Sequence, residues 1–317
     1  MTDELTACLA GYVEQASLDS SGQFTLSAEK SLEKLKNFSL AEPRLYVLNA
    51  LAAAQSAGAR SIAAECDADD TILHADTDFD FGPYLKDLSH RLLDDKSPPA
   101  VRELAMAFHA AKGLNPGAIE VVGGSQRLRW SPDGREVVEP FAGQGLRLHV
   151  HERLGLRTLR KAWSYRWGEV RLDTEEDALK RHCNLTPLPT RINGQPLARP
   201  LDLGECQHHL FSGCRDLDSQ HPLARCLALR GARARSQPGP YPVVLAEGGR
   251  LPPYLVLVVR GVNYRMPAKG VDTRDFKAIA YVDHLRKDLS QTQLVQDQDF
   301  KGVLTHIGRL LRDMRKG

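Results

Sequence analysis

The chain has 317 residues, of which 42% are hydrophobic and 26% are charged, so its composition is that of an ordinary globular protein with room for two domains. Its 42 basic and 40 acidic residues nearly cancel, and a formal charge of +2 excludes a strong overall attraction to nucleic acid or to an anionic membrane. Six scattered cysteines lack the density of a secreted disulfide scaffold, which favours reduced thiols.

The first residues lack the pattern of a secretory signal. MTDELTACLAGYVEQA carries acids where a signal would carry basic residues, and its apolar positions have the spacing of an amphipathic helix. The densest apolar run, PPYLVLVVRGV, has the length of a buried strand. We therefore expect a cytoplasmic protein without a membrane-spanning segment.

Helical and strand patterns alternate in the first half of the chain. In chain order we expect helices over 27–38 and 43–57, two strands within 59–76, a loop and a helix over 78–93, a helix over 99–114, and strands within 118–141 and over 143–153. Pro43 lies near a first turn and Gly58 follows a last one, which supports the bounds of the second helix. This order predicts helices packed on one face of a mainly antiparallel sheet.

The pattern changes from about Arg157 onward. We expect helices over 157–172 and 174–183, strands within 189–197, 241–249 and 254–262, and a final helix over 299–317. The stretch LRGARARSQPGPYP, residues 229–242, is rich in Arg, Gly and Pro, so we expect a surface loop there.

Cysteine and histidine gather in one part of the second half. The stretches HCNLTPLP and ECQHHLFSGC could supply metal ligands from Cys183, Cys206, His208, His209 and Cys214. Zinc sites with soft ligands usually contain Cys-x-x-Cys pairs, and these stretches contain none. We therefore expect buried thiols and loop histidines here, and no metal.

The stretch LNALAAAQSAGARSI, residues 48–62, begins as an alanine-rich helix, stops at a glycine and continues as a strand. This order resembles the end of the N-box in the ATPase superfamily of gyrase, heat-shock chaperone, histidine kinase and MutL, abbreviated GHKL. MutL-like members place Glu, Asn and Asp before Ala-Gly-Ala, and those positions fall here on Asn49, Ala53 and Ser56. Steps of four and three residues put all three on one helical face.

The resemblance implies that the chemistry of this face is lost. In such an ATPase the acid orients the attacking water and the amide ligates Mg²⁺. Asn49 is a poor base, and Ala53 has no oxygen to offer the metal. We therefore expect no catalytic residue on this helix; ATP or ADP binding stays possible, while Mg²⁺ binding is not expected.

Two further stretches resemble nucleotide-binding boxes of the same superfamily. DFDFGPYLKDL is similar to the Asp-x-Gly loop that reads adenine, which gives Asp80 and Gly82, with Tyr84 where the second glycine would be. FAGQGLRLHV is similar to the later Gly-x-Gly entry into a strand, which gives Gly143 and Gly145. Each stretch could also be only a tight turn, and their order along the chain is what supports the joint interpretation.

The second half resembles the ribosomal-S5-like domain that follows the ATPase domain in chaperones and MutL. HLRKDLSQTQLVQD is similar to the chaperone segment that supplies an arginine to the phosphate: Ser290 and Leu294 match, but the arginine position holds Gln291. Arg286 and Lys287 lie nearby, although we expect charged residues before a loop to be solvated.

The sequence therefore predicts an α+β protein with a degenerate Bergerat-type α/β sandwich over 1–155 and a chaperone-middle-like, S5-like βαβ domain over 156–317. The expected function is that of a chaperone-like pseudo-ATPase that acts through protein partners, with a homodimer possible. The alternative is an active chaperone-like or MutL-like ATPase with non-standard catalytic residues. Nucleic-acid binding through RGARARSQPGP and the tail RLLRDMRKG is disfavoured, since scattered arginines are more typical of a solvated surface.

Overall fold

The computed structural model describes residues 42–94, 96–167, 174–197, 201, 203, 206, 208–248, 254–266, 276–288 and 293–316. Residues Phe38–Gly317 form one compact unit. The predicted helix over 27–38 lies outside the described residues, as do Ser290 and Gln291.

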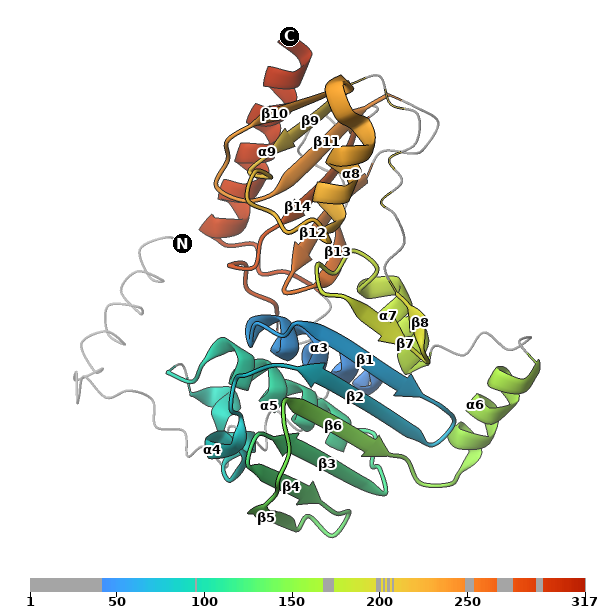
Figure 1. Ribbon diagram of the computed structural model, residues 1–317. Helices are drawn as coiled ribbons and strands as arrows, with labels where there is room; N and C mark the ends of the chain where they lie inside the picture. Colours follow the sequence, from blue (N-terminus) through green and yellow to red (C-terminus); the bar gives the residue numbers. More distant parts are fainter. Residues whose placement is uncertain are drawn as a thin grey trace, which may run out of the picture. The chain divides into compact units, whose positions relative to one another are not determined.

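An eight-stranded sheet forms the first part of this unit, in the strand order β5-β4-β3-β6-β2-β1-β7-β8 (Figure 1). Its strands are β1 (Ser61–Cys66), β2 (Asp70–Asp76), β3 (Ala118–Gly123), β4 (Gln126–Trp130), β5 (Glu136–Pro140), β6 (Leu146–His151), β7 (Thr190–Ile192) and β8 (Gln195–Pro196). Neighbours pair antiparallel except β1 and β7, which are parallel. The prediction of a mainly antiparallel sheet is confirmed.

Helices cover one face of this sheet. They are η1 (Pro43–Leu45), α3 (Tyr46–Ser56), α4 (Gly82–Leu85), η2 (Leu88–Leu93), α5 (Pro99–Lys112) and α7 (Glu175–His182). Helix α6 (Leu156–Trp167) lies to the side of the sheet (Figure 1). Strand β1 alternates exposed and buried residues, and its buried residues share one hydrophobic core with α3 and α5. The alternation therefore defines an inner, helix-covered face and an outer face that carries the polar side chains.

The alanine content of α3 is explained by its neighbours. Ala50, Ala52, Ala53 and Ala54 are fully buried, and α3 packs against α5. Small side chains allow two helices and a sheet to approach closely, whereas larger ones would overfill this layer. The helix ends at Ser56, and Gly58, two residues later, has a φ of +66° that suits a residue without a side chain.

A six-stranded mixed sheet forms the second part, in the order β10-β9-β11-β14-β12-β13. Its strands are β9 (His208–Ser212), β10 (Ala234–Gln237), β11 (Val243–Glu247), β12 (Tyr254–Val259), β13 (Val262–Met266) and β14 (Phe276–Tyr281). The helices of this part are α8 (Pro222–Arg230), η3 (Gly231–Arg233) and α9 (Gln298–Lys316). Strand β9, helix α8 and strand β10 form a βαβ unit with parallel strands.

Several predictions need correction. The stretch 229–242 is not a loop throughout, because it contains the end of α8, η3 and the edge strand β10, whose polar residues face water. The region 78–93 forms two short helices, α4 and η2, instead of one. Strands β9 and β14 and helix α8 had no predicted counterpart.

The domain division stays a prediction. Helix α7 and strands β7 and β8 follow the predicted boundary at residue 155, yet β7 and β8 belong to the first sheet. The α+β class agrees with the structure, while the Bergerat and S5-like assignments are finer than the topology alone establishes. Within the described ranges, every helix is too short or too polar to cross a membrane.

Candidate functional site

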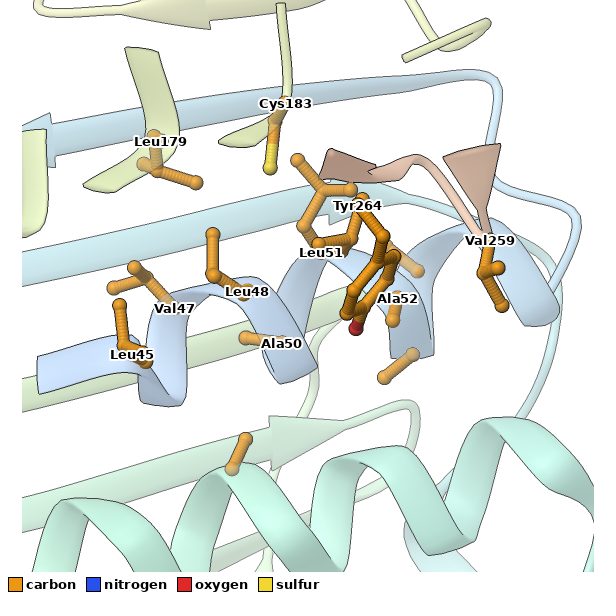
Figure 2. Close-up of a cluster of buried hydrophobic side chains, with 14 of the residues drawn as sticks. Leu45, Val47, Leu48, Ala50, Leu51, Ala52, Leu179, Cys183, Val259 and Tyr264 are labelled. Atoms are coloured by element: carbon orange, nitrogen blue, oxygen red, sulfur yellow. The ribbon is translucent and has the colours of Figure 1, made fainter. Parts of the chain in front are cut away.

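The predicted N-box face is closed by the protein itself. Asn49 is 1% exposed and Ala53 is fully buried. Figure 2 shows Leu179 of α7 and Cys183, which follows α7, above α3, and Tyr264 of β13 beside Leu51. Apolar side chains therefore enclose the helix on which the resemblance places the nucleotide chemistry.

Asn49 contacts a lysine from the far end of the chain. Its Oδ1 accepts a hydrogen bond from Lys287 Nζ at 3.2 Å. Its Nδ2 is buried and has no hydrogen-bond partner among the residues that the structure describes. A buried amide with an unused donor costs free energy, so this polar position is not explained by stability alone.

Lys287 belongs to a buried charged cluster, which we define as Asn49, Glu103, Arg260 and Lys287. Glu103 of α5 accepts from Lys287 Nζ at 2.5 Å with one oxygen and from Arg260 at 2.5 Å with the other. Arg260 lies at the turn between β12 and β13. The cluster thus joins α3 and α5 of the first sheet to two segments of the second.

The side chains of Lys287 and Glu103 are only 4% and 6% exposed. Burial lowers the pKa of Lys287, because removal from water disfavours its charge, and the nearby carboxylate of Glu103 opposes that shift. The expectation that this charged segment is solvated is therefore wrong for Lys287. It holds for Arg286, whose side chain is 69% exposed and pairs with Asp297.

Asp80 and two of the predicted glycines, Gly82 and Gly145, lie at one end of the first sheet. Asp80 is exposed, and its Oδ1 accepts from the backbone N–H of Gly82 at 2.9 Å. A Cβ on Gly124 would lie 2.2 Å from that oxygen. Gly124 in turn donates to the carbonyl of Gly145 at 3.2 Å. The structure therefore brings Asp80, Gly82 and Gly145 together around the β3–β4 turn.

Close backbone approach explains Gly145 of the predicted Gly-x-Gly box, and neighbouring side chains crowd Gly143. Gly145 has a φ of +72°, and a Cβ there would lie 2.3 Å from the carbonyl oxygen of Ala75 in β2. A Cβ on Gly143 would lie 3.0 Å from both Phe141 and Val122. A packing role at the entry to β6 accounts for these residues without a ligand.

Ser56 lies at the end of α3, and its buried Oγ has no hydrogen-bond partner among the described residues. The predicted site residues thus fall into separate surroundings: Asn49 contacts the charged cluster, whereas Asp80 contacts the glycine turn.

The cysteine- and histidine-rich stretches do not form a shared metal site. Cys183 follows α7 beside α3, His209 lies in β9, and Cys206 contacts Lys277 at 3.3 Å. Across the described part of the chain, the one set of three potential ligands within 4.8 Å of one another is Asp69, Asp70 and His151. Sequence reasoning missed this set, although HVH within a strand places both histidines on one face.

No model of a known protein family matches this chain, and none of the curated proteins matches it. The resemblance to the GHKL superfamily therefore stays a prediction that depends on the motifs.

Proposed function

We propose that this chain is a chaperone-like, GHKL-type pseudo-ATPase that binds adenine nucleotide weakly at most and acts through protein partners. The observation that carries the proposal is the charged cluster: the Glu103 carboxylate lies between Lys287 and Arg260, and Asn49 accepts from the same lysine. The Glu103 carboxylate thus pairs with Lys287 and Arg260, the two cations that could otherwise bind a phosphate group.

Ligand entry at this face would be costly. Separating one member of a buried, hydrogen-bonded ion pair typically costs about 3 to 5 kcal/mol. Ala53 adds no compensating metal ligand, because its side chain has no oxygen. Any nucleotide contact through Asp80 would therefore be weak and insensitive to Mg²⁺.

The alternative, an active ATPase, needs a group that orients the attacking water. Glu103 is a carboxylate beside the N-box face, but both of its oxygens accept from cations. A general base needs an oxygen that is available to the proton it removes. This arrangement favours the pseudo-ATPase over the active enzyme.

An exposed apolar surface on α6 supports action through a protein partner. Leu154, Leu156 and Leu159 are 85%, 83% and 63% exposed. Leu156 and Leu159 are three residues apart and share one side of the helix. Contiguous exposed apolar residues are typical of interaction surfaces.

The orientation of α6 is fixed by a buried lysine. Lys161 contacts Glu152 and Glu175, and all three residues are buried. Exposed Arg153 and Arg160 accompany the leucines. An apolar segment with acidic neighbours fits this surface better than a second copy of α6, because arginines would then face arginines.

Hydrolysis is the first test. Phosphate release from ATP and Mg²⁺ should not exceed that of a mock purification, and Asn49→Glu alone should recover nothing, since groups that act as a unit are not additive. Steady release that is lost in Asp80→Asn, and is absent from the mock purification, would contradict the proposal and favour the active ATPase.

The partner surface has a matched control. Leu156→Ser with Leu159→Ser should abolish retention of a specific protein partner, whereas Leu229→Ser on α8, where the leucine is 76% exposed, should not. The retained protein is then purified and titrated against the unmodified chain, the double leucine variant and Leu229→Ser. Equal affinities for the three would show that α6 is not the partner surface.

A further inference from the structure

Two histidines and an aspartate converge on the outer face of the first sheet. His149 and His151 lie two residues apart in β6, so both side chains leave the same face. Asp70 of β2 is the direct cross-strand partner of His151, and His149 is its diagonal neighbour. The pairing register of β2 and β6 therefore creates this group.

Both histidine side chains contact the same oxygen of Asp70. His149 Nε2 lies 2.5 Å from Asp70 Oδ1, and His151 Nδ1 lies 3.0 Å from the same oxygen. Asp69, at the start of the same hairpin arm, adds a second carboxylate within 4.8 Å of Asp70 and His151. One imidazole nitrogen and two carboxylates are thus available within a small volume, and His149 contacts this set through Asp70.

Three other acids on this face have different partners. Glu120 pairs with Arg129, Glu139 with Arg127, and Asp76 with Arg60, which are the cross-strand ion pairs expected of a solvated sheet face. Asp70 instead faces two imidazoles, which are ordinary metal ligands in their neutral form. This difference separates the Asp70 group from the general polarity of the face.

A pocket adjoins the group. Its volume is about 540 Å³, and His149 and His151 form part of its lining. Strands β3, β4 and β5 supply Glu120, Arg129, Trp130 and Glu139 to the same walls. A ligand held by the histidines would therefore border a space large enough for a small molecule.

We propose that Asp69, Asp70 and His151 bind one divalent transition-metal ion, and that Zn²⁺ fits this set best. An imidazole with two carboxylates matches the nitrogen and oxygen ligands that Zn²⁺ takes in proteins. At metal–ligand bonds of about 2.0 to 2.2 Å, tetrahedral ligand atoms lie roughly 3.4 Å apart. Asp70 and His151 would therefore separate slightly, and the ion would replace their present hydrogen bond. This site is independent of the proposed pseudo-ATPase function.

The test uses the full chain after removal of metals with a chelator. Calorimetric titration with Zn²⁺ should give one tight site per chain, and Co²⁺ should give visible absorption bands of a low-symmetry nitrogen and oxygen site. His151→Ala and Asp70→Asn should each weaken Zn²⁺ binding at least tenfold. Asp70→Asn keeps the shape of the side chain and limits the risk of misfolding.

His74→Ala is the matched control. His74 is exposed on the same face of β2, opposite Arg147, and outside the Asp70 group. Its loss should leave Zn²⁺ affinity unchanged. Absence of stoichiometric Zn²⁺ binding would overturn the proposal, as would affinities that are equal in the His151→Ala and His74→Ala chains, because the ion would then bind elsewhere.

Discussion

Polar groups are buried and paired on the inner face of the first sheet, whereas on its outer face they lie near the surface. On the inner side, α3 and α5 enclose Asn49 and Glu103, and the cations that meet them come from distant parts of the same chain. On the outer side, His149 and His151 border a pocket and contact Asp70 near the surface. The inner groups bind each other, whereas the outer groups are accessible to a ligand.

The face that carries the predicted motif positions therefore differs from the face that could bind a ligand. The inner face carries the positions of the N-box that the sequence predicts for a GHKL protein, but alanine, leucine and a buried ion pair fill the space beside them. The outer face carries no motif of that superfamily, yet it offers metal-ligand chemistry beside a pocket. We infer that the face with the predicted N-box positions is not the one best suited to an external ligand.

The largest expected effect is on the inner face. Lys287→Met should lower the free energy of unfolding by about 3 kcal/mol or more, because it leaves Glu103 and Asn49 buried with fewer partners. Urea denaturation measures this. Arg286→Ala is the control, since that side chain is 69% exposed and should contribute less than about 1 kcal/mol. Similar losses for both variants would mean that the charged cluster is hydrated in solution.

The next effect concerns the glycines at the sheet end. Gly145→Ala should cost about 2 to 4 kcal/mol, because the left-handed conformation disfavours a side chain and the new Cβ would overlap the Ala75 carbonyl. Gly194→Ala has a similar φ of +76° without any atom within 4 Å, so it should cost about 1 kcal/mol. Thermal unfolding of the two variants separates the effect of the contact with Ala75 from the effect of the backbone conformation. Equal losses of stability in the two variants would mean that packing does not explain Gly145, which would then again be a candidate ligand residue.

The smallest effect is expected on the outer face. Without metal, His151→Ala should change the free energy of unfolding by no more than about 1 kcal/mol, since this exposed side chain contributes one hydrogen bond near water. Chelated protein in urea provides the measurement. A loss as large as that of Lys287→Met would show that the outer group is structural, and the contrast between the faces would fail.

Local patterns were sufficient to predict much of the first sheet. Pro43 and Gly58 bracket the helix that contains α3, and alternation within 59–76 predicted both β1 and β2. Strands β9 and β14 escaped because they are buried almost throughout and so lack a period of two. Residues 222–228, where α8 begins, received no prediction.

Contacts between residues far apart in the chain could not be predicted from the sequence. Lys287 and Glu103 are 184 residues apart, and nothing local to Lys287 distinguishes it from solvated Arg286. Likewise, the alternation around His149 predicts a strand, but its meeting with Asp70 depends on the register of β2 and β6. Asp80, Gly82 and Gly145 lie around one turn, where packing explains the glycine contacts, and their role in nucleotide binding stays a prediction.

Calorimetric titration of the unmodified chain with ATP, in the presence and absence of Mg²⁺, tests the closed inner face most directly. We predict weak or undetectable binding that is unchanged by the metal, because Ala53 offers no ligand and Glu103 engages the cations. A gain of tenfold or more on adding Mg²⁺, about 1.4 kcal/mol, would contradict this account. It would mean that the helix face opens to admit a metal-bound nucleotide.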